Sequence, residues 1–279
     1  METVKITAQD VNKLRQTTGV GMMDCKKALE ESNGDFEAAI EILRKKGQKV
    51  AANRSDRSAN EGYVLGLVTA DKTKGVLVAL NCETDFVAQN ADFGSFATKV
   101  TNIALDKMPA TKEDLLNELI DGRSINDHIT DMVGKIGEKI EIGCFEKVDG
   151  AFVFAYNHPG NRIVAIVGLN KTVDGAETAA KNVAMQAASM NPVALDKNDV
   201  PQDLIEKEIE IAKDLLRQEG KPEDKIEMIS KGKIEKYFKE NTLLNQDYIM
   251  DNKMTVSQYL KSLDKDLTVS AFKRYGLGQ

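Results

Sequence analysis

The side chains that most often carry chemistry in proteins are sparse in this sequence. It contains two histidines, His128 and His158, and three cysteines, Cys25, Cys82 and Cys144. No C-x-x-C pair and no H-E-x-x-H run occurs, so the sequence indicates neither a structural zinc site nor a zinc-protease site. Three scattered cysteines cannot all pair with one another, which favours reduced thiols over a disulfide scaffold. We therefore expect no bound metal.

Motifs for nucleotide binding and for nucleophilic catalysis are absent as well. The sequence has no G-x-x-x-x-G-K-[ST] loop, no G-x-G-x-x-G after a strand and no G-x-S-x-G. Carboxylates are plentiful, but none forms a recognisable acid–base pair. These absences predict a protein that has no catalytic chemistry and no cofactor of its own. An enzyme with an unrecognised site remains the alternative.

Composition and charge indicate what kind of protein this is and which partners it binds. The chain has 279 residues, which suggests about two domains at roughly 150 residues each. Hydrophobic residues make up 42% and charged residues 29%, which is typical of a globular protein. With 38 Lys+Arg against 44 Asp+Glu, the formal net charge is -6. Phosphate recognition depends on Lys and Arg, so we expect no direct nucleic-acid partner.

Two further observations concern location. The longest clean apolar run, from Ile163 to Leu169, is far shorter than the ~20 residues of a membrane span. The first residues, METVKITAQD, have neither a basic-then-apolar signal pattern nor an Arg-rich transit pattern. We expect a cytoplasmic protein without a membrane partner.

The N-terminal part has the pattern of three short helices within residues 1–47. Thr7 and Asp10 form a capping-box pattern at the start of the first helix. Gly47 is expected to end the third helix, because glycine favours helix termini. The polar stretch 48–61 has little periodicity, which predicts a linker.

The middle of the chain predicts a duplicated α+β core. Residues 62–139 contain the strand patterns GYVLGLVT and GVLVALNC, followed by helical periodicity. Residues 140–199 repeat this order with GAFVFAYN, NRIVAIVGLN and a helix from about 175 to 190. We expect each copy to form a small antiparallel sheet with packed helices. The run from Ile140 to Val148 is expected to add a strand to the second sheet.

Residues 200–238 change to a pattern of two amphipathic helices. Gly220 suits the end of the first helix and Pro222 the start of the second. The narrow apolar seams and charged flanks predict an inserted antiparallel helical hairpin, a short coiled coil. Residues 239–279 then supply a closing helix and strand. The hairpin could serve homodimerisation or another contact with a partner.

Two stretches carry a specific family resemblance. They are LRQTTGVGMMDCKKALEESNGDFEAAIEILRKKG, from Leu14 to Gly47, and LNCETDFVAQNADF, from Leu80 to Phe93. Both resemble elongation factor Ts, the guanine-nucleotide exchange factor of the GTPase elongation factor Tu. The order of parts is similar too, with a three-helix domain of the ubiquitin-associated type, a duplicated core and a helical hairpin. The resemblance implies a translation factor that binds elongation factor Tu-GDP and promotes GDP release.

The resemblance also implies a wedge that acts on the partner. In that family the residues that match Thr84, Asp85, Phe86 and Val87 form a tip that enters the GTPase near its magnesium and phosphate groups. From the residues alone, Thr84 suits a helix cap and Asp85 the first helical turn. Core packing is the usual fate of a phenylalanine, so a buried Phe86 remains the alternative.

Six further residues match partner-binding positions of the family. They are Arg15, Met22, Met23, Ile136, Gly137 and His158. Methionines adapt to irregular contact surfaces, although one of the two could equally fill the small N-terminal core. Ile136 is expected in a Gly-bracketed turn, either as a contact or as a buried anchor. His158 precedes Pro159 and Gly160 in a type II turn pattern, which places it on an exposed hairpin tip.

A competing function rests on the N-terminal helices alone. A module of this kind could bind ubiquitin-like proteins or nascent chains without any exchange activity. That hypothesis accounts for residues 1–47, but not for the T-D-F-V run or the duplicated core.

Overall fold

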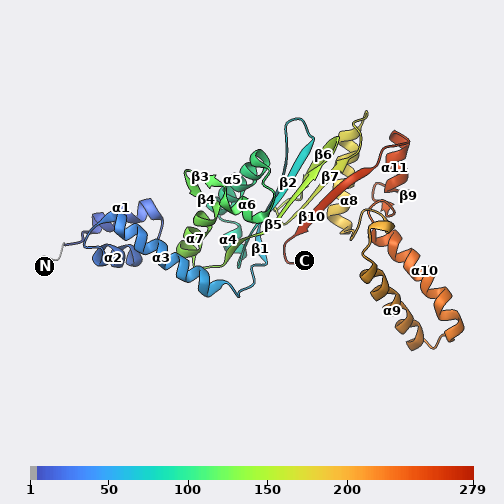
Figure 1. Ribbon diagram of the computed structural model, residues 1–279, viewed down its shortest axis with the longest axis horizontal. Coiled ribbons are helices and arrows are strands. Elements are labelled where there is room, and N and C mark those ends of the chain that lie inside the picture. Colours follow the sequence, from blue (N-terminus) through green and yellow to red (C-terminus); the bar gives the residue numbers. More distant parts are fainter. Residues whose placement is uncertain (1–4) are drawn as a thin grey trace. The chain divides into compact units, whose positions relative to one another are not determined.

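A computed structural model describes residues 5–279 (Figure 1). Helices alternate with small sheets, which confirms the α+β class. The chain divides into two compact units, and strands β1, β2 and β5 contribute to both. The first unit comprises the residues up to Tyr63, Val78–Phe145 and Leu277–Gln279, and the second comprises Val64–Leu77 and Glu146–Gly276. Among residues 5–279, no helix has the length and apolar character needed to cross a membrane.

The chain begins with three helices, α1 (Ala8–Thr18), α2 (Met22–Glu31) and α3 (Phe36–Arg54). The predicted capping box at α1 is confirmed, because Thr7 accepts from the backbone N–H of Asp10 and Asp10 accepts from that of Thr7. The helices enclose a small core of apolar side chains. It contains Val11, Leu14, Cys25, Ala28, Leu29, Ala39 and Leu43.

The predicted end of the third helix at Gly47 is wrong. Helix α3 continues to Arg54, so residues 48–54 of the expected linker are helical. Gly47 lies against Gly134 of helix α7 (Ile125–Ile136), where a Cβ on Gly134 would be 2.8 Å from the Gly47 Cα. The glycine therefore allows two helices to approach closely and does not stop the helix.

The first sheet has the order β1-β2-β5. Strands β1 (Glu61–Val68) and β2 (Lys74–Cys82) match the predicted hairpin. Strand β5 (Ile140–Asp149) lies beside β2, so its expected place in the second sheet is wrong. Gly143 of β5 has no side chain, and a Cβ there would lie 2.6 Å from the Asn81 side chain of β2. Strands β2 and β5 therefore approach closely at this position.

Four helices and a two-stranded ribbon lie between β2 and β5. Their bounds are α4 (Asp85–Ala88), α5 (Ala91–Lys107), α6 (Lys112–Asn117), β3 (Leu119–Ile120) and β4 (Arg123–Ser124), before α7. Phe93 of α5 is buried, as expected for a core residue. The expected Gly-bracketed turn at 134–138 is wrong in part. Ile136 is the last residue of α7, and Gly137 caps that helix with a φ of 81°.

The second sheet has the order β10-β7-β6 and is antiparallel. Its strands are β6 (Phe152–Asn157), β7 (Ile163–Leu169) and β10 (Val269–Gly276). Helix α8 (Ala176–Met190) packs against β6 and β7 with its alanine-rich face. The predicted hairpin, helix and closing strand of this part are therefore confirmed.

Helices α9 (Gln202–Gln218) and α10 (Glu223–Asn241) pack against each other, as predicted for the inserted segment (Figure 1). Gly220 in their connection has a φ of 72°, which suits glycine. The buried residues along their contact include Ala212, Leu216, Ile226 and Ile234. The remaining elements are a short 3-10 helix (Lys197–Asp199), β8 (Asp247–Tyr248), β9 (Asp251–Thr255) and α11 (Val256–Leu263).

Candidate functional site

Phe86 projects from a short exposed turn of the first unit. It belongs to α4, a helix of four residues with no buried member. The Phe86 side chain is 86% exposed, the largest exposed fraction among the large apolar side chains of the described residues. A core role for Phe86 is therefore wrong. A phenylalanine left in water is a candidate for contact with another molecule.

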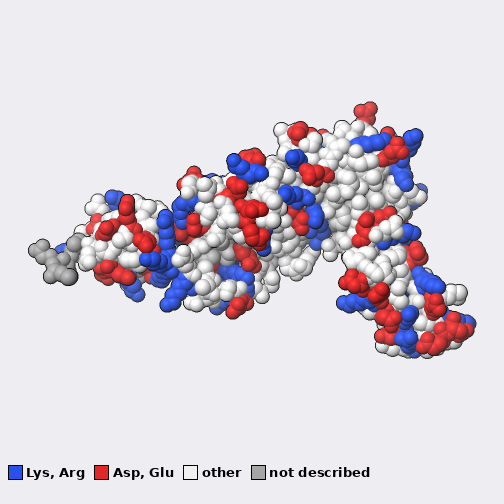
Figure 2. Space-filling view, viewed as in Figure 1, with Lys and Arg blue, Asp and Glu red and all other residues white. Residues whose placement is uncertain are grey.

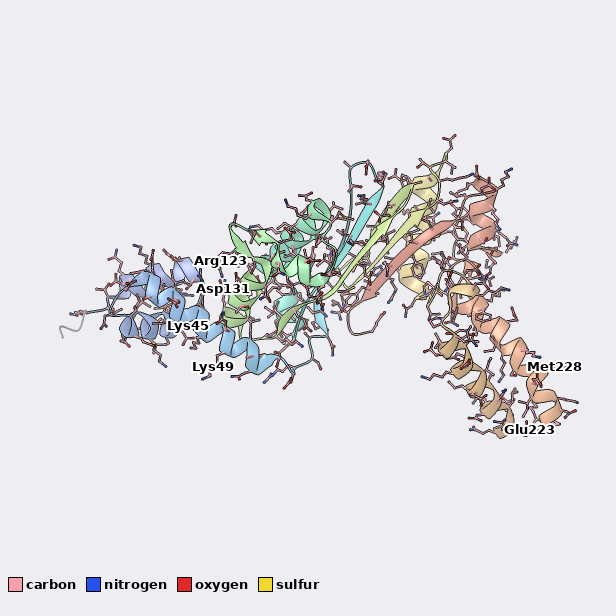
Figure 3. The ribbon with its side chains drawn as sticks, viewed as in Figure 1. Lys45, Lys49, Arg123, Asp131, Glu223 and Met228 are labelled. Atoms are coloured by element: carbon pink, nitrogen blue, oxygen red, sulfur yellow. The ribbon has the colours of Figure 1, made fainter. Side chains whose placement is uncertain are left out.

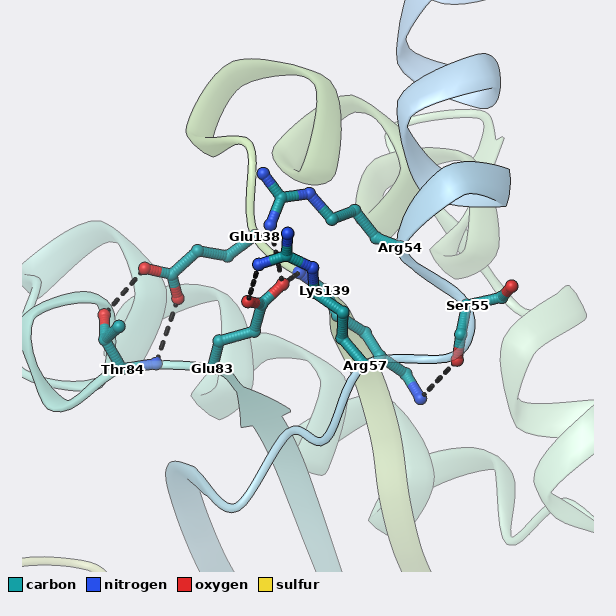
Figure 4. Close-up of polar contacts among 7 residues, drawn as sticks. All are labelled: Arg54, Ser55, Arg57, Glu83, Thr84, Glu138 and Lys139. Carbon is teal, nitrogen blue, oxygen red and sulfur yellow. Dashed lines mark hydrogen bonds and ion pairs between the residues drawn. The ribbon is translucent and has the colours of Figure 1, made fainter.

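Thr84 fixes the beginning of this turn (Figure 4). Its hydroxyl accepts from the backbone N–H of Val87 at 3.5 Å and donates to Glu138 Oε1 at 2.7 Å. Its backbone N–H donates to Glu138 Oε2 at 3.0 Å. The predicted cap is confirmed, and a carboxylate beyond the end of α7 holds the capping residue in place.

Glu83 makes the complementary contacts (Figure 4). Its carboxylate accepts from the backbone N–H of Lys139 at 2.7 Å. It also pairs with the guanidinium of Arg57 at 3.2 Å and with that of Arg54 at 3.4 Å. The hydrogen bond from the Lys139 N–H, then Arg57 and Arg54, lower the pKa of Glu83 from its ordinary value. The carboxylate is therefore charged at neutral pH and holds three donors.

The predicted contact residues of the N-terminal helices are all on the surface. Arg15 is exposed on α1. Met22 and Met23 begin α2 and are 48% and 66% exposed, so neither fills the small core. Gly19, in the loop before α2, approaches Lys135 of α7, since a Cβ on Gly19 would be 2.8 Å from the Lys135 Cε.

Ile136 and Gly137 directly precede Glu138, whose carboxylate accepts hydrogen bonds from Thr84 at the start of the Phe86 turn. Both Ile136 and Gly137 are half-buried, in contrast to the exposed isoleucine that one interpretation of the sequence required. The end of α7 thus connects to the Phe86 turn through Glu138 and to the loop before α2 through Lys135. Two of the predicted contact segments, 84–87 and 136–137, are brought together in this way.

His158 belongs to the second unit. It is exposed at the tip between β6 and β7, as predicted. The Asn161 N–H donates to the His158 carbonyl, and Gly160 has a φ of 89°, which fits the expected type II turn. The Tyr156 hydroxyl and His158 Nδ1 are 3.0 Å apart, which holds the imidazole over the strand end.

The comparisons with known proteins agree over almost the whole chain. The family described as Elongation factor TS matches residues 83–279. The chain is 57% identical to Elongation factor Ts of Flavobacterium psychrophilum, covering 98% of this chain and 99% of the relative. Identity is 56% with Elongation factor Ts of Christiangramia forsetii, at the same coverage, and 50% with that of Porphyromonas gingivalis, at 98% of both chains.

The chain belongs to the elongation factor Ts family. It is a guanine-nucleotide exchange factor of translation elongation, and its partner is the GTPase elongation factor Tu. The family match begins at Glu83, one residue before the Phe86 turn is capped.

The sequence analysis assigns no role at the site to four residues around the turn of this elongation factor Ts. They are Arg54, Arg57, Glu83 and Glu138. Their hydrogen bonds to one another, to Thr84 and to Lys139 span 26 to 56 residues of chain. Arg54 and Arg57 fell in a segment expected to be linker. The only local signal was the position of Glu83, directly before the T-D-F-V run.

Cys82 of this elongation factor Ts lies two residues before Thr84. The Cys82 thiol donates to the Thr84 carbonyl at 3.2 Å, and burial raises its pKa to about 12. Such a thiol is a poor nucleophile. Within residues 5–279, no group of three or more His, Cys, Asp or Glu side chains is placed to hold a metal ion.

Proposed function

We propose that the protein binds elongation factor Tu-GDP and uses Phe86 to disturb the magnesium and phosphate site of the GTPase. The observation that carries this proposal is the 86% exposure of Phe86 on a turn anchored at its first residue. Burial of such a side chain contributes roughly 1.5–3 kcal/mol. A wedge that gains this contact only in the loosened GTPase favours that state, because a ligand shifts an equilibrium by its differential affinity.

The GTPase supplies the nucleotide site in this scheme. Magnesium and the phosphate loop provide much of the phosphate affinity in P-loop GTPases, so their displacement speeds GDP release. Each tenfold gain in rate requires a barrier lower by about 1.4 kcal/mol. By reciprocity, bound nucleotide must weaken the binding of the exchange factor by the same factor. The exchange factor itself carries out no covalent chemistry and needs no cofactor.

The remaining predicted residues form the docking surface in this proposal. Arg15, Met22 and Met23 make the first contact, and Ile136 with Gly137 extends it beside Thr84, Asp85 and Val87. His158 adds a secondary contact from the second unit. The exposed methionines support this assignment, because their flexible side chains fit an irregular partner surface.

The finer parts of the architecture belong to the same proposal. We assign 1–47 to a domain of the ubiquitin-associated type, 62–139 and 140–199 to the two core copies, 200–238 to a coiled-coil hairpin and 239–279 to the closing helix and strand. The segment 48–61 joins the N-terminal domain to the core, and its first part is helical. We also propose that the hairpin of α9 and α10 can mediate homodimerisation.

Interspersed charges support the absence of a direct nucleic-acid partner. On the face shown in Figure 2, small groups of acidic and of basic side chains lie near one another between areas of other residues. A cytoplasmic location follows from a role in translation. A ubiquitin-type or nascent-chain module remains less well supported, because it leaves Phe86 unexplained. Stimulated GDP release by the Phe86→Ala variant is the direct test.

A further inference from the structure

We infer that Glu83 and Glu138 are positioning residues that hold Phe86 in the direction required for nucleotide release. The inference rests on the proposed function, since it concerns the residues behind the wedge. We call the group formed by Glu83, Thr84, Glu138 and Lys139 the Glu83–Glu138 clasp. Neither Glu83 nor Glu138 needs to touch the GTPase for the clasp to act.

The clasp is reciprocal. The Glu138 carboxylate accepts from the backbone N–H of Thr84, and the Glu83 carboxylate accepts from the backbone N–H of Lys139. The segment 83–84 and the segment 138–139 are thus joined twice, each time by a glutamate of one segment and a backbone N–H of the other (Figure 4). The third bond, from the Thr84 hydroxyl to Glu138, is also charge-assisted and measures 2.7 Å. Charge-assisted bonds of this kind are roughly twice as strong as neutral ones.

The turn needs such an anchor because it has no core. Helix α4 spans four residues, none of them buried, and a helical segment of that length is not stable by itself. Phe86 is exposed and contributes no packing, while Val87 and Ala88 are only half-buried. The bonds at the first residue of the turn therefore add to the limited contact that α4 makes with α5.

The other side of the clasp rests on larger elements. Helix α7 buries Ile125, Ile129 and Val133 and packs against α3. Arg54 and Arg57, at and just beyond the end of α3, pair with Glu83 from outside the turn. The Lys139 ammonium donates to the Ser55 carbonyl at 3.0 Å. The clasp thus joins a turn without buried residues to two packed helices.

A positioning role predicts which kinetic quantity changes. If Phe86 stays present but points in many directions, docking is nearly unaffected, while fewer complexes reach the loosened state. The maximal rate of GDP release should then fall, and the half-saturating concentration of the exchange factor should change little. A direct contact residue would instead raise the half-saturating concentration.

The test compares substitutions at Glu138 in the full chain with elongation factor Tu loaded with a fluorescent GDP analogue. Glu138→Ala is expected to lower the maximal release rate about tenfold. Glu138→Gln keeps a carbonyl acceptor for the Thr84 N–H and should restore most of that loss. Glu141→Ala is the matched control, because Glu141 pairs with the Lys139 ammonium and not with Thr84. It should leave the rate unchanged.

A second readout does not depend on the GTPase. Exchange of the Thr84 backbone amide with solvent, followed by NMR on the free protein, should be faster in Glu138→Ala and unchanged in Glu141→Ala. If Glu138→Ala does not fold, Glu83→Ala removes the other carboxylate of the clasp, and the same fall in the maximal rate is expected.

Three results would overturn the inference. They are an unchanged maximal rate in Glu138→Ala, a loss confined to the half-saturating concentration, and a Gln variant no better than Ala. These results are distinct from failure of the proposed function, which Phe86→Ala tests separately. A slow Phe86→Ala with a fully active Glu138→Ala rejects the clasp and keeps the wedge.

Discussion

Thr84 and Glu138 are 54 residues apart in the sequence, yet they share two hydrogen bonds of 2.7 and 3.0 Å. Thr84 opens the turn that carries Phe86, and Glu138 follows the helix cap at Gly137. The most exposed large apolar side chain of the described residues is therefore attached to a packed helix through one carboxylate. This relationship explains how a turn without a core can present a defined surface.

Removal of the two exposed methionines should weaken docking. We expect Met22→Ala combined with Met23→Ala to raise the half-saturating concentration of the exchange factor at least about tenfold, because two apolar contacts are lost. The maximal rate of GDP release should stay the same. Met228→Ala is the control, since Met228 is 71% exposed on α10 and points outward there (Figure 3). Titration of stimulated GDP release measures both quantities, and equal half-saturation for the two variants would contradict the docking role.

The contact between Gly47 and Gly134 predicts a loss of stability on substitution. Gly134→Ala places a Cβ 2.8 Å from the Gly47 Cα, where backbone must shift. We expect the free energy of unfolding to fall by about 1–3 kcal/mol. Gly232→Ala is the matched control, because a Cβ there meets nothing within 4 Å in the exposed middle of α10. It should raise stability by roughly 0.5–1 kcal/mol. Urea unfolding of both variants tests the difference in sign.

Acid should weaken the clasp through Glu83. Its pKa in the folded protein lies below the ordinary value of 4.5, chiefly through the Lys139 N–H and then through Arg57 and Arg54. The resulting stabilisation is therefore present above about pH 4.5 and is lost as the pH falls through the lower, folded-state pKa. Glu83→Gln should lose stability at neutral pH and depend less steeply on pH in the acid range.

Glu227 provides the control for this pH dependence. The hydrogen bond from Lys231 also lowers its pKa, but both side chains are 76% exposed, so solvent screens the pair. Glu227→Gln should leave the acid limb of the stability curve nearly unchanged. The pH dependence of the three proteins is compared through their urea unfolding midpoints between neutral pH and a pH of about 3.5. Parallel curves for Glu83→Gln and the unsubstituted protein would contradict the assignment.

Local signals in the sequence were reliable guides to local structure. The Thr7–Asp10 capping box and the Thr84 cap form as predicted, because each bond joins residues three positions apart. The turn at His158 forms for the same reason, since Pro159 and Gly160 supply the dihedral angles that it requires. The α+β class and the paired helices α9 and α10 also followed from periodicity.

Contacts between distant segments were not predictable from the residues. Glycine is typical of a helix end, so the sequence favours a stop at Gly47. The structure shows instead that Gly47 lies inside α3, where it gives room for the close approach of Gly134. Strand β5 pairs with β2, where Gly143 fits against Asn81. The alternation of apolar and polar residues in β5 does not specify that partner. The contact of Glu138 with Thr84 was not predictable for the same reason, because the two residues are 54 positions apart.

The wedge proposal is tested most directly by Phe86→Ala. Because Phe86 is 86% exposed, the substitution should leave the unfolding free energy within about 0.5 kcal/mol. Leu119→Ala is the control, since Leu119 is an exposed apolar residue of the same unit that lies outside the proposed site. Stopped-flow release of a fluorescent GDP analogue from elongation factor Tu should slow about 10- to 100-fold at saturating Phe86→Ala. Release at the rate of the unsubstituted protein would contradict the central claim.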